Sequence, residues 1–217
     1  MNIYRSHIIN EIISFYGELL HPKSSESIYH HLSKLSIKMS EGLKQKETCV
    51  YAQLNNYHPY YLGNSISVLR EKEIKLADCQ LTIANEYGLS SWKEVQALEQ
   101  IHHNMEFENC VNAIINGDTE SLKNALKAHP DLIMAKSQYG HKATLLHYTA
   151  SNGVEFWRQQ VPMNLEDIIL ILLHAGADKS ALMNVYDGGF TPYELYTTSA
   201  HPIASGLNTS TAELLKN

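Results

Sequence analysis

The sequence predicts an all-α protein, in which an N-terminal helical region covers one end of a short solenoid of helix pairs. Three observations predict this. Apolar residues recur at helical spacing through most of the 217 residues. Glycines follow several of these segments, as they do at helix C-termini. The pattern of helix, glycine and second helix returns at Gly117 and Gly153, which are 36 positions apart.

Composition excludes several classes of protein. Hydrophobic residues make up 44% and charged residues 18%, so the chain can bury a core. The net charge is −6, with few arginines, which disfavours binding to nucleic acid or to an anionic membrane surface. The longest aliphatic run, residues 168–173, is far shorter than the roughly 20 residues that span a bilayer. We therefore expect neither a nucleic-acid partner nor a membrane partner.

The cysteines and the N-terminus favour a cytoplasmic protein. Cys49, Cys79 and Cys110 are odd in number and form no C-x-x-C pair, which disfavours a disulfide framework or a zinc ribbon. Residues 8–20 contain several polar residues, whereas a secretion signal has a continuous apolar core.

The first half of the chain reads as a series of helices. Apolar residues follow helical spacing over 3–20, and again over 27–54, where Gly42 divides the pattern. A further helix is expected over 76–88, followed by a short one over 91–98. These segments form the expected N-terminal helical region, residues 1–104.

The second half, residues 105–217, contains the helix pairs. A helix over 109–116 ends at Gly117 and is followed by a second helix to about residue 128. The same order returns with helices expected over 144–152 and 167–174. Each pair would leave an apolar face uncovered, so neighbouring pairs must stack to bury it.

The residues of this half carry a resemblance to a known family. Residues 144–153 (Thr-Leu-Leu-His-Tyr-Thr-Ala-Ser-Asn-Gly) resemble the first helix of an ankyrin repeat, and 168–178 resemble its second helix and Gly-Ala-Asp exit. Residues 187–195 resemble the next opening helix, 113–126 an atypical first repeat, and 210–215 a shortened last helix. The resemblance implies about three ankyrin repeats, capped by the N-terminal helices.

The resemblance also implies roles for single residues. Thr144 would cap its helix, and His147 would bond back to it and to a neighbouring repeat. The chain departs from the family at Leu145, which replaces proline, at Glu194, which replaces histidine, and at an insertion over 154–164. Residues 76–98 also resemble a stretch that precedes ankyrin repeats in bacterial proteins, so the resemblance is to bacterial-type members.

No sequence motif indicates catalysis. The chain lacks a P-loop, G-x-G-x-x-G, G-x-S-x-G and H-E-x-x-H. Among the 12 histidines, His103 and Glu106 share a helical face, but two ligands do not make a metal site. We therefore expect no catalytic residues, no metal and no cofactor.

The candidate partner-binding residues lie at the turn tips between repeats and in the insertion. Ankyrin-type stacks bind partners through these tips and through the concave face of the first helices. Aromatic and arginine side chains concentrate in binding hot spots. The candidates are Tyr139, His141, Lys142, Trp157, Arg158, Tyr186 and Phe190. Two alternatives stay open: Tyr139 and Phe190 merely pack on adjacent tips, or Phe156 and Trp157 fold back onto the stack.

The sequence thus favours a non-enzymatic protein–protein interaction scaffold whose partner is another protein. An alternative makes the N-terminal region a small ligand-binding or enzymatic domain, with the repeats as an accessory. Its pocket would be lined by His58 and by five tyrosines: Tyr51, Tyr57, Tyr60, Tyr61 and Tyr87. A neutralising partner for a bacterial toxin or effector is a third possibility.

Overall fold

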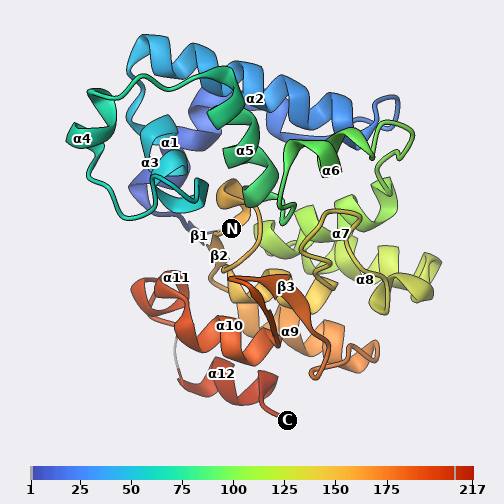
Figure 1. The fold of residues 1–217 in the computed structure, drawn as a ribbon. Coiled ribbons are helices and arrows are strands. Elements are labelled where there is room, and N and C mark those ends of the chain that lie inside the picture. The colour runs from blue at the N-terminus through green and yellow to red at the C-terminus, as the bar shows by residue number, and fades with distance from the viewer. Residues whose placement is uncertain (1, 208) are drawn as a thin grey trace. The chain divides into compact units, whose positions relative to one another are not determined.

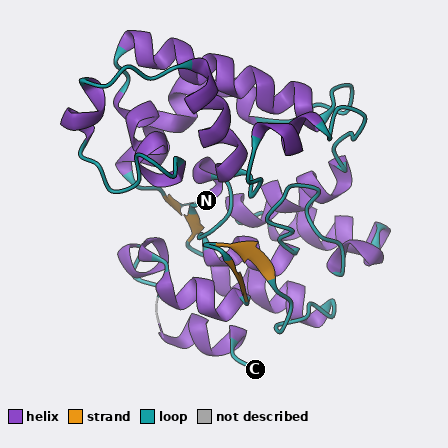
Figure 2. Ribbon diagram, in the orientation of Figure 1, coloured by secondary structure: helices purple, strands orange, loops and turns teal. Residues whose placement is uncertain are grey.

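The computed structural model describes residues 2–207 and 209–217 and is mostly helical (Figures 1 and 2). The chain forms two compact units. The N-terminal unit is His7–His103, and the C-terminal unit is Asn104–Asn217 together with the short segment before His7. Within the described part of the chain, no helix combines the length and apolarity needed to cross a bilayer.

The N-terminal unit consists of helices and their connections. Its elements are α1 (His7–Tyr16), the 3-10 helix η1 (Gly17–Leu20), α2 (Ile28–Gln45), α3 (Thr48–Tyr57), α4 (Ile66–Arg70), α5 (Leu76–Glu86) and α6 (Trp92–Gln96). Helix α2 packs on α5, while α3 contacts α1, α4 and α5. Ile9, Leu32, Leu54 and Ile83 are among the residues of its core.

Gly42 does not divide the second helix, contrary to the prediction. Helix α2 runs through this residue to Gln45 and is capped by Lys46, which adopts a left-handed conformation (φ 59°). A Cβ at Gly42 would lie 2.6 Å from both Phe15 Cζ and Val50 Cγ2. The glycine is therefore required by close packing of α1 and α3 against α2, and it does not mark a turn.

The C-terminal unit contains the helix pairs and four short strands. Its helical elements are α7 (Met105–Asn116), α8 (Thr119–Ala128), η2 (Pro130–Ile133), η3 (Leu145–Ala150), η4 (Phe156–Arg158), α9 (Leu165–His174), α10 (Pro192–Thr198), α11 (Ala200–Ala204) and α12 (Thr209–Leu215). The strands are β1 (Ile3–Tyr4), β2 (Val161–Pro162), β3 (Met183–Val185) and β4 (Gly188–Phe190). Strand β1 pairs antiparallel with β2, and β3 pairs antiparallel with β4.

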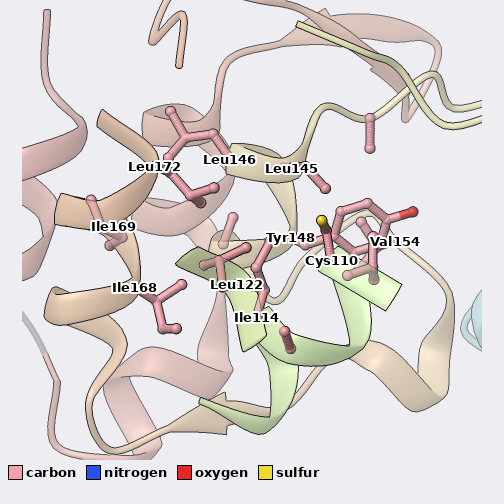
Figure 3. Packing of buried hydrophobic residues seen from close by; sticks show 14 of the residues in the cluster. Cys110, Ile114, Leu122, Leu145, Leu146, Tyr148, Val154, Ile168, Ile169 and Leu172 are labelled. Carbon is pink, nitrogen blue, oxygen red and sulfur yellow. The ribbon is translucent and has the colours of Figure 1, made fainter. Parts of the chain in front are cut away.

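The larger helical elements of this unit pack in two rows. In the first row, η3 contacts α7 and α10; in the second, α9 contacts α8 and α12. The rows are joined where α7 packs on α8, η3 on α9, and α10 on α12. Figure 3 shows side chains from both rows meeting in the core, including Ile114, Leu146 and Leu172.

Local sequence explains how the first helix pair turns. Gly117 ends α7 in the left-handed conformation (φ 70°), which glycine adopts without steric cost. Asp118 then caps α8 by accepting a hydrogen bond from the Ser121 N–H at 3.0 Å.

Candidate interaction surface

The β3–β4 hairpin projects two unusual residues at its turn. Tyr186 and Asp187 connect the strands, with φ values of 52° and 58°. Positive φ at both central residues is the signature of a type I′ turn, which normally carries Asn-Gly. A bulky residue such as tyrosine is disfavoured there. Such strain persists where the surrounding structure enforces it and often marks functional positions.

The Tyr186 side chain is large, exposed and held in place. It is 65% exposed, and its hydroxyl donates to Asn152 Oδ1 at 2.7 Å. Its ring meets that of Phe190 edge-on, with 6.2 Å between the centroids. Leu182, which precedes β3, is 49% exposed. The hairpin therefore presents apolar side chains to solvent in a fixed geometry.

The turn over residues 136–144 lies beside the hairpin. Lys136 and Thr144 form a β-bridge that closes this turn, and Ser137 N–H donates to Ala143 O at 2.7 Å. Asn184 N–H of the hairpin donates to His141 O at 2.7 Å, so the two tips form one continuous structure. We call this structure, residues 136–144 and 182–190, the tip surface.

A buried histidine fastens the tip surface to the helices. His147 Nδ1 accepts from the Thr144 N–H at 3.1 Å and lies 2.8 Å from the Thr144 hydroxyl, while Nε2 lies 3.1 Å from Phe190 O. Burial lowers the pKa of His147 to about 4. The ring is thus neutral at pH 7, and Nε2–H donates to the Phe190 carbonyl.

The structure separates the seven candidate residues into two groups. Lys142 and Tyr186 are exposed and Phe190 is half-buried. Tyr139, His141, Trp157 and Arg158 are buried, so their expected direct contact with a partner needs correction. Phe156 and Trp157 are both buried, which agrees with the alternative in which these two side chains fold back onto their own unit.

Arg158 is buried because two carboxylates neutralise it. Its Nη1 donates to Glu155 Oε1 at 2.9 Å, and its Nη2 donates to Glu108 Oε2 at 2.5 Å. The guanidinium also lies 4.8 Å from the Trp157 ring centroid, within range of a cation–π contact. Arg158 therefore joins the insertion to α7 inside the unit and has a structural role.

The carboxylates of this cluster respond differently to burial. Burial acts to raise the pKa of Glu155, but Arg158 and His141 outweigh it and lower that pKa to about 2. His141 Nε2 lies 3.8 Å from Glu155 Oε2. Burial raises the pKa of Glu108, and Arg158 offsets this only in part. Glu155 is thus ionised at neutral pH and pairs with the Arg158 guanidinium.

The N-terminal unit contains a cleft of about 420 Å³, but it is not the pocket that the sequence suggested. The cleft is lined by His7, Asn10, Glu11, Ser14, Phe15, Glu47, Thr48 and Cys49, and none of the tyrosines contributes. His58 instead stacks on Tyr61 at 4.3 Å, and Tyr60 is 82% exposed. Burial, followed by Glu11 and Glu47, raises the pKa of the Cys49 thiol to about 11, which keeps it unreactive at neutral pH.

Comparisons with known proteins found no similar curated protein and no similar solved structure, and no protein-family model matches the chain. Among the described residues, no three His, Cys, Asp or Glu side chains are grouped to hold a metal ion.

Proposed function

We propose that the protein is a non-enzymatic interaction scaffold that binds another protein through the tip surface of its C-terminal unit. In this proposal the C-terminal unit is a short ankyrin-like stack of about three repeats. The first helices of the repeats are α7, η3 and α10, and the second helices are α8, α9 and α12.

The packing of the two rows supports an ankyrin-like stack. Each element of a row contacts the next element of that row and also the paired element of the other row. His147 supports it further, because its bonds to Thr144 and to Phe190 O link one helix pair to the following tip. The family resemblance implies this role for a histidine at this position.

The exposure of Tyr186 is the observation that carries the binding proposal. Tyrosine is enriched in binding hot spots because it offers a large, rigid contact area. Here it occupies a turn position that disfavours it, and Asn152 fixes its hydroxyl. Leu182 and Lys142 are the other exposed large side chains of the tip surface that this proposal uses.

A cytoplasmic location fits this proposal. Cys49, Cys79 and Cys110 are all free thiols buried in the structure, as expected in a reducing compartment.

The test compares one exposed tyrosine with another. Full-length tagged protein is used to isolate a partner from the source cells, and the affinity of the purified pair is then measured. We expect Tyr186→Ala to weaken binding about tenfold or more, as removal of a hot-spot residue does. Tyr60→Ala, at an exposed site of the N-terminal unit, is the matched control and leaves affinity unchanged. Equal affinities for wild type and Tyr186→Ala contradict the proposal.

The cleft of the N-terminal unit supports a second candidate function, the binding of a small ligand. Its lining includes the carboxylates of Glu11 and Glu47, which suit an organic ammonium group, while the Phe15 ring already has Lys38 Nζ at 4.6 Å from its centroid. Titration of the full-length protein with butylammonium, followed by NMR, tests this. Saturable shifts at cleft residues that Glu47→Gln abolishes support it, and their absence contradicts it.

A further inference from the structure

We propose that strand β4 binds an extended segment of a partner protein as an added β-strand, with Gly189 at the centre of the pairing. This inference rests on the proposed function and specifies the form of the partner: a backbone in extended conformation that pairs along one edge of the hairpin.

The register of the hairpin determines which backbone groups point outward. Val185 pairs with Gly188, Asn184 with Gly189 and Met183 with Phe190. In a two-residue hairpin the pair beside the turn exchanges hydrogen bonds, and the next pair does not. Asn184 therefore directs its N–H away from β4, and its bond to His141 O confirms this direction.

Gly189 must then direct its own N–H and C=O away from β3, toward the opposite edge. Gly188 and Gly189 are both exposed, and no described residue hydrogen-bonds to the Gly189 backbone. Natural sheets usually protect such edges with lysine, proline or a covering segment. Here two glycines leave the edge open, which is the arrangement that strand addition requires.

The surface above Gly189 indicates which side chain the added strand would carry. A Cβ at Gly189 would lie 3.3 Å from Leu182 Cδ1, so Leu182 leans over the glycine. Leu182 is itself largely exposed. An aromatic or branched apolar side chain opposite Gly189 would pack on Leu182 and cover the glycine, as occurs in strand pairs that contain an edge glycine.

The size of the edge argues for a partner segment and against a second copy of this chain. Strand β4 has three residues. Pairing two such edges would bury far less than the roughly 1,600 Å² of a stable protein interface. An extended segment can instead continue past β4 onto the exposed Tyr186, so it gains contacts that a short symmetric pairing lacks.

The experiment compares two variants of Gly189, one that removes the backbone N–H of this residue and one that keeps it. Short linear peptides displayed on phage are selected against the full-length protein, and the bound peptides are studied by NMR. Gly189→Pro removes the outward N–H without touching a ladder bond of the hairpin. Gly189→Ala adds the same Cβ and keeps the N–H. Circular dichroism and the His147 ring signals check that both variants remain folded.

We expect selected peptides with an apolar residue opposite Gly189 and cross-strand NOEs between the peptide and the Gly189 α-protons. Gly189→Pro should weaken the affinity for these peptides about tenfold, and Gly189→Ala should weaken it much less. Failure to select any peptide, bound peptides that are helical, or equal loss in both variants overturns strand addition. If Tyr186→Ala weakens the binding of an isolated protein partner while Gly189→Pro leaves that binding unchanged, the scaffold function stands and strand addition fails.

Discussion

At the level of single residues, the C-terminal unit depends on polar groups that are buried yet paired. His147 must be neutral to accept from Thr144 and donate to Phe190 O. Arg158 must be charged to satisfy Glu108 and Glu155. Each group therefore ties stability to a defined protonation state.

The first prediction concerns His147 and acid. Burial lowers its pKa from 6.5 to about 4, so below pH 6.5 the unfolded chain binds a proton that the folded chain does not. Stability from this group is full above pH 6.5 and is lost as pH falls toward 4, by about 3 kcal/mol. In urea unfolding from pH 7 to 4, His147→Gln should lack this loss. Parallel pH profiles for both proteins contradict the assignment.

The second prediction concerns Arg158. Arg158→Met leaves two carboxylates buried without a cation, so we expect the free energy of unfolding at pH 7 to fall by about 3–5 kcal/mol. Adding Glu108→Gln and Glu155→Gln to that variant should restore much of the loss. The deficit should also shrink in acid, where the carboxylates are protonated. If urea denaturation shows that Arg158→Met lowers the free energy of unfolding by less than about 1 kcal/mol, the cluster does not stabilise the fold as proposed.

Of the predicted partner-binding residues, the sequence correctly indicated the exposure of some and did not indicate the burial of others. Lys142 and Tyr186 lie on the surface as expected of turn residues. The burial of Arg158 was not predictable from Glu155 alone, which lies three positions before it, because its second partner, Glu108, is 50 positions away and no local pattern links that pair. A charged residue is normally placed on the surface unless its counter-ion is known.

At the level of elements, the periodicity of apolar residues predicted the longer helices. It did not predict the short strands or the close helix packing at Gly42. Strands of two or three residues, such as β2 and β3, carry too few positions to show alternation. From sequence, Gly42 predicts a helix boundary, because glycine usually weakens helices. Its actual role depends on Phe15 and Val50, which contact it only in the folded unit.

The third prediction concerns the hairpin turn. Asp187 has a positive φ (58°), which glycine adopts without cost. We expect Asp187→Gly to raise the free energy of unfolding by about 0.5–1 kcal/mol. Asp187→Ala, which removes the same carboxylate without relieving the backbone, is the control and should be neutral or destabilising. The two variants are compared by thermal and urea unfolding; equal effects show that the turn is not strained.

At the level of the whole molecule, the chain divides into two units, each with a buried core. Among the described residues, those that form the core of the C-terminal unit all belong to that unit, from Tyr4 to Leu215. A mostly helical chain was predictable from apolar spacing, because that signal is repeated in almost every segment. The association of β1 with β2 was not, because those strands are 157 positions apart and consist of two residues each.

The fourth prediction tests the two cores separately. The chain has two tryptophans, Trp92 in the N-terminal unit and Trp157 in the C-terminal unit. Gly42→Ala forces a side chain against Phe15 and Val50, so we expect about 1–3 kcal/mol of destabilisation in the N-terminal unit. Fluorine NMR of fluorotryptophan-labelled protein in urea should show an earlier Trp92 transition and an unchanged Trp157 transition.

Glu41→Ala, at an exposed neighbouring position of α2, is the control and should move neither transition. If Gly42→Ala shifts both tryptophan signals equally, the cores do not unfold independently.

In the proposed ankyrin-like stack, the Arg158 cluster would also limit how the array can evolve. Repeat arrays commonly lengthen by gene duplication of an internal module, because each module carries its own contacts to its neighbours. Duplication of the segment that the proposal assigns to the middle repeat would bring a second copy of Arg158 but no second Glu108, which belongs to α7. The extra arginine would be buried with one carboxylate fewer, so growth of the array by copying this module is disfavoured.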